Sequence, residues 1–174
     1  MISVMRKVLF NAALVLSALI ALTVSASAQG RAPEFSLRST DGAAVTSQSL
    51  HGDVVVLTFG ASWLPLTRNQ MEAAKKLADG YAGRGVVVYW VSTESDNPKS
   101  KNFASEDQLR ELSRKYKVKV LRDGDGSVAK RLGVDQVPSV LIIDKQGQVA
   151  FSQGGMDPNA NLVTQLSERI NKLL

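Results

Sequence analysis

The chain has 174 residues, and its 21 Lys and Arg against 16 Asp and Glu give a formal net charge of +5. A hydrophobic content of 44% with 21% charged residues is typical of a globular domain and excludes a disordered chain. The chain has one His and no Cys, which excludes disulfides, thiol catalysis, thiolate metal ligands and a His-rich metal site. We therefore expect no metal and no other cofactor.

Residues 1–28 have the pattern of a secretory signal peptide. Arg6 and Lys7 form a positively charged start, and residues 8–24 form an apolar run without a charge. The small residues Ala-Ser-Ala that end at Ala28 match the cleavage box of such a peptide. The apolar run is also about long enough to span a bilayer, so a retained membrane anchor is the alternative.

Cleavage near Ala28 would leave a mature domain of residues 29–174 that is exported to the periplasm or secreted and begins at Gln29. The net charge would fall from +5 to +3, because the removed segment holds two basic residues and no acid. So mild a charge does not favour nucleic-acid binding. We interpret the densest basic stretch as a solvated face, and its members are Arg110, Arg114, Lys115, Lys117, Lys119 and Arg122.

Apolar runs and helical periodicity alternate along the mature chain. Continuous β-branched runs such as DVVVLTF indicate strands that are buried on both faces. We predict strands at residues 35–38, 53–59, 86–91, 117–121, 139–144 and 148–152. We predict helices at residues 65–81, 105–116, 127–132 and 157–173. This order favours an α/β sandwich whose sheet is partly parallel and ends in an antiparallel hairpin.

Local signals mark the starts of three helices. Ser105 and Gln108 have the spacing of a capping box. Pro65 suits the first turn of the helix that follows the first long strand. Asp157 is predicted to cap the last helix, with Pro158 at the first helical position.

Two segments at strand ends carry a resemblance to a known family. The first is FGASWLPLTR at residues 59–68, and the second is GVDQVPS at residues 133–139. Together they resemble the thioredoxin superfamily, and most closely the exported TlpA-like thiol–disulfide oxidoreductases with an AhpC/TSA-type redoxin domain. Matching segments at residues 32–35, 50–53 and 144–147 extend the resemblance over residues 32–173.

The resemblance implies a fold and a local geometry. The expected fold is a thioredoxin-like three-layer α/β/α sandwich with a mixed central sheet. The family carries a cis-proline beside its active site, which implies a cis Val137–Pro138 bond here. Trp63, Pro65 and Arg68 match the family's active-site segment, whereas Gly60 replaces a common Trp.

The sequence departs from the family at the two residues that perform its chemistry. Leu64 stands where the nucleophilic Cys would be, and Thr67 stands where the resolving Cys would be. Thiol–disulfide exchange requires a thiolate that attacks sulfur. The motif Trp63-Leu64-Pro65-Leu66-Thr67 is therefore vestigial, and we assign no catalytic residue. Disulfide reduction, isomerisation and thiol-peroxidase chemistry are therefore excluded. Whether the chain is an enzyme of another kind stays open, and we favour a protein without catalytic activity.

Two other catalytic or metal-binding patterns are weak. Ser62 lies in a near match to the nucleophile elbow of hydrolases, but its only candidate base, His51, lies before the strand that Ser62 follows. A strand of seven residues spans about 20 Å, so the two groups should lie at opposite ends of the sheet.

The segment DGDGS at residues 123–127 resembles a calcium loop, but it lacks the required Gly and Glu. We interpret it as a turn that caps the next helix. The acidic pairs Glu94/Asp96 and Glu106/Asp107 are interpreted as loop and first-turn acids.

The vestigial motif still offers a surface. In the family's fold the turn around Leu64 lies beside the loop that holds the cis-proline. We name this surface the former active face, and its residues are Trp63, Leu64, Leu66, Val137 and Pro138. Exposed apolar surface of this kind marks interaction sites, and in the family the backbone before the cis-proline pairs with an extended substrate peptide.

We therefore predict a redox-inactive exported protein that binds a polypeptide partner at the former active face. In one alternative, Leu64 and Leu66 pack against the sheet, and the protein is a scaffold or decayed paralogue that acts through another surface. In the other alternative, it is a cysteine-independent enzyme.

Overall fold

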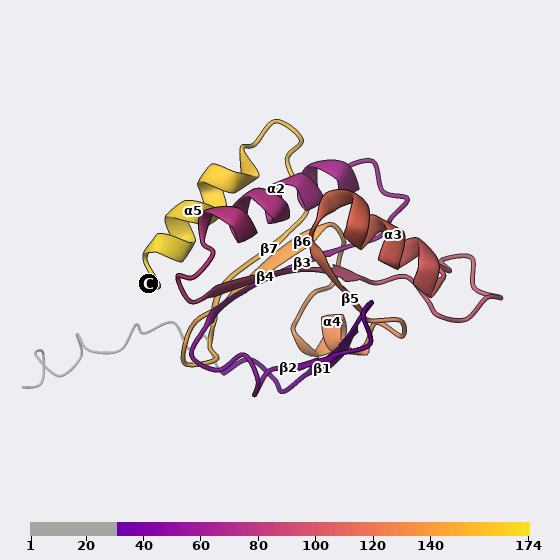
Figure 1. Cartoon of the computed structure of the whole chain (residues 1–174), viewed down its shortest axis with the longest axis horizontal. Helices are drawn as coiled ribbons and strands as arrows, with labels where there is room; N and C mark the ends of the chain where they lie inside the picture. Colours follow the sequence, from indigo (N-terminus) through magenta and orange to yellow (C-terminus); the bar gives the residue numbers. More distant parts are fainter. Residues whose placement is uncertain (1–30) are drawn as a thin grey trace, which may run out of the picture.

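The computed structural model describes residues 31–174, so the predicted signal peptide (1–28) and its cleavage site lie outside the described residues. Within that part of the chain, seven strands form one mixed sheet in the order β2-β1-β5-β4-β3-β6-β7 (Figure 1). The strands are β1 (Ser36–Ser39), β2 (Ala44–Thr46), β3 (Val54–Gly60), β4 (Val86–Ser92), β5 (Lys119–Arg122), β6 (Ser139–Ile143) and β7 (Val149–Gly154). The pairs β3–β4 and β4–β5 are parallel, and the others are antiparallel.

Helices cover both faces of the sheet, which confirms the predicted three-layer architecture. Three of them lie on one face, and α4 lies on the other beside β1 and β2 (Figure 1). The helices are α2 (Thr67–Gly80), α3 (Glu106–Tyr116), α4 (Ser127–Arg131) and α5 (Leu162–Asn171). None of the helices between residues 31 and 174 is long and apolar enough to cross a membrane.

The interior strand β3, which lies between β4 and β6, divides the core into two layers. Its seven residues are all buried, as its uninterrupted apolar run predicts. Val54 and Val56 pack into the cluster under α2, α3 and α5. Val55, Leu57 and Phe59 pack into the cluster under α4 and the first hairpin. Each such side chain contributes about 1.5–3 kcal/mol on full burial, so this strand anchors both layers.

Two of the predicted helix starts are wrong, for local reasons. Pro65 lies before α2, because backbone bonds from Leu64 N to Ala61 O and from Thr67 N to Leu64 O close two turns first. The capping box of Ser105 and Gln108 at α3 is confirmed.

The start of α5 is also later than predicted. Asp157 accepts backbone hydrogen bonds from Asn159 and Ala160, so Asp157 and Pro158 form a separate turn. The helix is capped instead by Asn161, whose Oδ1 accepts from Thr164 N at 3.1 Å. The short strand β2 lacks a clear alternating pattern and was not predicted.

One buried amide joins the elements below the end of β3. Gln70 of α2 is 1% exposed, and its Nε2 donates to the carbonyl oxygens of Phe59 at 3.0 Å and Ser139 at 3.1 Å. Its Oε1 accepts from Trp90 Nε1 at 2.9 Å. The same contact explains Gly60, because a Cβ there would lie 2.6 Å from Gln70 Oε1 and 3.1 Å from the Trp90 ring.

Replacing Gln70 by Leu should destabilise the protein strongly. The variant keeps the volume roughly constant but leaves Trp90 Nε1 without its acceptor, and we expect a loss of about 2–4 kcal/mol in the free energy of unfolding. Urea denaturation measures this. The matched control is Asn69→Leu on the exposed side of the same helix, for which we expect a change within about 0.5 kcal/mol. Equal midpoints for the two variants would contradict the structural role of Gln70.

Candidate functional site

The two motif segments meet at one end of the sheet. Phe59 near the end of β3 pairs with Ser139 at the start of β6 in an antiparallel register. The turn that follows β3 and the loop that precedes β6 therefore share the same edge. The Val137–Pro138 peptide bond is cis, as the resemblance implied. This edge is the former active face.

The former active face is partly exposed and largely apolar. Trp63 is 64% exposed, one of the few large apolar side chains on the described surface. Leu64, Leu66, Val137 and Pro138 are each half-buried, and Val137 packs against the core layer under α4. The leucines are thus neither free nor fully packed away, and a ligand that covers this face would remove apolar surface from water.

The Trp63 ring is held in its exposed position by a neighbouring loop. Its Nε1 donates to Asn102 Oδ1 at 2.8 Å, and Asn102 Nδ2 in turn donates to the carbonyl oxygen of Thr93 at 3.1 Å. Phe103, which follows Asn102, is 37% exposed. The loop that positions the Trp63 ring thus also carries an exposed aromatic side chain.

The backbone beside the cis-proline is available for pairing. The carbonyl of Pro138 accepts from Gly155 N at 2.9 Å. By contrast, none of the hydrogen bonds formed within residues 31–174 uses the backbone N–H or C=O of Val137. A donor and an acceptor on one half-exposed residue are the groups that an added strand requires.

Thr67 has a structural role in place of the resolving Cys. Its side chain is buried, and its Oγ1 donates to the carbonyl oxygen of Ala61 at 2.5 Å. The hydroxyl thus closes the turn between β3 and α2 from inside. It is not presented to a ligand.

Glu94 lies in the loop after β4, as interpreted, but it has a structural role there. It is 1% exposed and lies under the turn, where its carboxylate accepts three hydrogen bonds. Oε2 accepts from Ser62 N at 2.9 Å and from Ser92 Oγ at 3.1 Å, and Oε1 accepts from Ser62 Oγ at 2.6 Å. The carboxylate therefore ties the former active turn to the end of β4.

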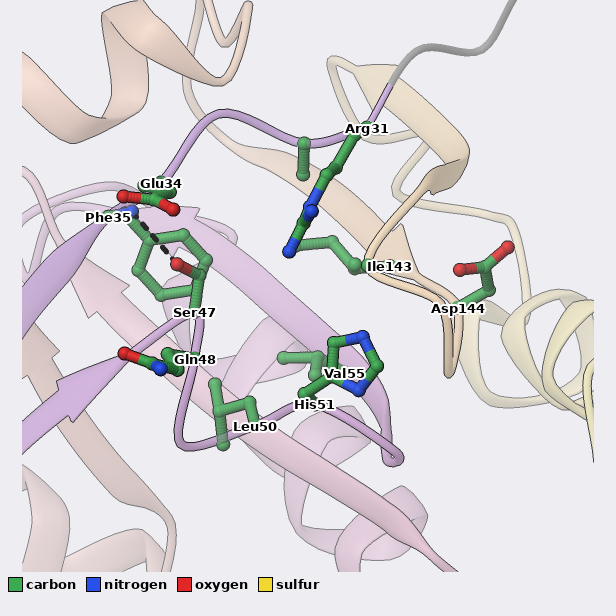
Figure 2. Close-up of a pocket in the computed structure, with 12 residues that line it drawn as sticks. Arg31, Glu34, Phe35, Ser47, Gln48, Leu50, His51, Val55, Ile143 and Asp144 are labelled. Atoms are coloured by element: carbon green, nitrogen blue, oxygen red, sulfur yellow. Dashed lines mark hydrogen bonds between the residues drawn. The ribbon is translucent and has the colours of Figure 1, made fainter.

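His51 and Ser62 are not brought together. Ser62 faces Glu94, whereas His51 lies before β3 at the opposite end of the strand. There it lines a cavity of about 140 Å³ together with Val55 and Ile143, and the Arg31 side chain points into the same space (Figure 2). A serine-hydrolase pair is thus not formed.

The acidic segment after β5 is a helix cap. The two carboxylate oxygens of Asp123 accept from Val128 N at 3.1 Å and from Ala129 N at 2.7 Å. The backbone N–H of Ser127 donates to Asp125 and lowers the pKa of that carboxyl. These bonds satisfy N–H groups at the start of α4 that have no partner within the helix, which confirms the interpretation as a turn that caps the helix.

The basic stretch does not form one solvated face. Arg122 is largely buried, and it contacts Glu106 at 3.2 Å, the carbonyl oxygen of Ser95 at 2.8 Å and that of Ala104. Burial of Arg122 on β5 removes it from the predicted surface. The exposed remainder includes Lys115 and Lys117, which turn toward α2.

Comparisons with known proteins agree with this geometry. The family model described as Redoxin matches residues 27–166. The thiol:disulfide interchange protein DsbE of Pseudomonas aeruginosa is 31% identical over 144 residues, which cover 82% of this chain and 74% of that protein. For several further thiol–disulfide oxidoreductases and thioredoxin-like proteins, the match covers less than two thirds of their length.

Solved structures share the thioredoxin-like fold. A putative DsbE from Chlorobium tepidum matches with a TM-score of 0.69 and 23% identity, over 82% of this chain and 94% of that one. A secreted disulfide oxidoreductase of Mycobacterium tuberculosis matches with a TM-score of 0.64 and 21% identity, over 80% and 96%. At these identities the likeness shows the fold alone.

Glu94→Gln should loosen the former active turn. The amide NH₂ group cannot accept a hydrogen bond, so at least one donor of Ser62 or Ser92 loses its partner. We expect a loss of about 1–3 kcal/mol in the free energy of unfolding, measured by urea denaturation. Asp96→Asn, an exposed acid on the same loop, should leave the midpoint unchanged. A Glu94→Gln protein as stable as this control would show that the carboxylate does not hold the turn.

Restoring the two missing thiols tests the alignment of the motif. Leu64→Cys with Thr67→Cys should form an intramolecular disulfide and reduce insulin in the presence of dithiothreitol, because the turn then carries a nucleophilic and a resolving thiol. Leu64→Cys alone is the matched control and should give no disulfide within the chain. If the double variant neither forms the disulfide nor reduces insulin, the motif is wrongly placed.

Proposed function

The chain belongs to the Redoxin family, and we propose that it is a redox-inactive, exported member that binds a polypeptide partner at its former active face. Its fold is that of the thiol–disulfide oxidoreductases to which it is similar. Thiol chemistry is closed to it, because no Cys occurs anywhere in the sequence and Leu64 and Thr67 supply no thiolate. The recognition surface of the fold does not depend on the thiols.

The observation that carries the proposal is the unused backbone of Val137. Its N–H and C=O have no partner within the described chain and lie beside the cis-proline, next to an apolar surface. An extended peptide could pair with this residue and place apolar side chains against Trp63 and Leu64. Backbone pairing supplies affinity in such an arrangement, and side-chain contacts supply specificity.

Export of the protein is supported by the sequence of its first 28 residues. A positive start, an uncharged apolar run and a small-residue box that ends at Ala28 together have the pattern of a cleaved signal peptide. The partner would then be a polypeptide of the periplasm or of the extracellular space.

Two alternatives remain distinct from this proposal. A scaffold or decayed paralogue would act through another surface and would leave the former active face empty. A cysteine-independent enzyme would need a nucleophile with an adjacent base. Ser62 and Glu94 form such a pair in the turn of the former active face. That carboxylate already accepts three hydrogen bonds, which disfavours it as a base.

Peptide binding should depend on the leucines of the former active face. We expect a library of random displayed peptides to yield binders to the protein, and Leu64→Asp with Leu66→Asp to weaken the binding at least about tenfold, because charged groups replace apolar contacts. Isothermal titration of the selected peptides measures the loss.

The matched control is Gln48→Asp with Gln146→Asp, which adds the same charge at exposed positions at the opposite end of the sheet. Affinity should stay within about twofold in this control. Binders that are unaffected by the leucine variant would contradict the proposal and favour a scaffold that acts through another surface. A library without binders would do the same.

A further inference from the structure

A groove rich in positive charge lies between α2 and the end of α3. It is open to solvent, with a volume of about 470 Å³. We name it the basic groove. Its charged residues are Arg68, Glu72, Lys75 and Lys76 of α2, with Lys115 and Lys117 at the end of α3. The two helices lie on the same face of the sheet (Figure 1).

Most of the positive charge in the basic groove is unpaired. Lys75 is bonded to Asp79. Among the ion pairs of residues 31–174, none involves Arg68, Lys76, Lys115 or Lys117. Glu72 is the one carboxylate in the lining. Five cations against one carboxylate in a concave site concentrate a positive potential there.

The basic groove starts at the former active face. Arg68 follows Thr67, the last residue of the vestigial motif, at the beginning of α2. From there Glu72, Lys75 and Lys76 continue along the helix at spacings of three to four residues, which places them on one side. A chain that leaves the former active face along α2 therefore enters the groove.

We propose that the basic groove binds an acidic segment of a polypeptide, as a continuation of the peptide that docks on the former active face. The inference rests on the proposed function and adds the composition of the partner. Asp and Glu side chains on an extended segment reach the lysines on both walls. Charge complementarity of this kind speeds association and selects the partner.

The chemistry of the basic groove favours a polypeptide over a membrane surface. Proteins that lie on anionic membranes combine basic residues with large apolar side chains that insert between lipids. The exposed large apolar residues of the described chain are Trp63, Phe103 and Leu174, and none of them lines the groove. A concave site between two helices also fits a chain better than a flat bilayer.

Fluorescence anisotropy with a labelled peptide of ten Glu residues tests the inference. We expect binding at low salt that is lost at about 0.5 M salt, where the Debye length shortens to a few ångströms. Lys76→Glu with Lys115→Glu should weaken binding at least about tenfold. Lys76→Gln with Lys115→Gln should give a smaller loss of affinity. This neutral variant replaces the charge-reversed variant in the test if the latter folds poorly.

The matched control reverses the same charge on the other face of the sheet. Lys130→Glu with Arg131→Glu changes exposed residues of α4 and gives the protein the same net charge. Affinity within about twofold of the parent supports the groove as the site. Equal losses in the two variants would overturn the inference, because net charge alone would then explain the binding.

Two further arms separate the outcomes. Binding to phosphatidylglycerol vesicles without binding to the acidic peptide would assign the groove to a membrane and overturn the inference. Selected peptides that need the leucines but not Lys76 and Lys115 would leave the proposed function intact and overturn this inference alone.

Discussion

The hydrogen bonds of Gln70 are the constraint on which the former active face depends. The amide is buried among apolar side chains, where an unpaired donor or acceptor costs several times the net value of a hydrogen bond. Its donors and its acceptor are all engaged, by two carbonyl oxygens from β3 and β6 and by the indole of Trp90. The start of α2 therefore has a fixed position relative to the ends of both strands. The turn before α2 and the loop before β6 are therefore also fixed relative to each other.

The polar groups around the turn replace what a disulfide would do in a redox-active relative. Thr67 bonds to the carbonyl oxygen of Ala61, and Glu94 bonds to both donors of Ser62. These contacts do not depend on the redox state, whereas a disulfide holds the turn only when it is oxidised. They therefore order the turn before any partner binds. A binding protein benefits from such preorganisation, because less conformational entropy is lost when the partner docks.

The fold could be predicted from sequence because its signals are local or evenly repeated. The apolar run of β3 predicts a strand, and the capping box of Ser105 predicts a helix start, without information from the rest of the chain. The structural roles of Glu94 and Gln70 could not be predicted, since their hydrogen-bond partners lie up to 69 residues away in the sequence. The residues next to a polar side chain in the sequence do not indicate whether it is buried. The basic groove was missed for a similar reason. Its charges come from two helices, and the densest basic stretch of the sequence contains only two of them, the lysines at the end of α3.

The two tryptophans of the chain lie in opposite environments. Trp90 is fully buried and hydrogen-bonded to Gln70, whereas Trp63 is 64% exposed on the former active face. Emission from a buried indole is shielded from a water-soluble quencher, and emission from an exposed indole is open to it. The protein thus carries an intrinsic optical reporter at its proposed binding surface and an internal reference in its core. Occupancy of the former active face can be followed in the unlabelled protein by the change in accessibility of one ring.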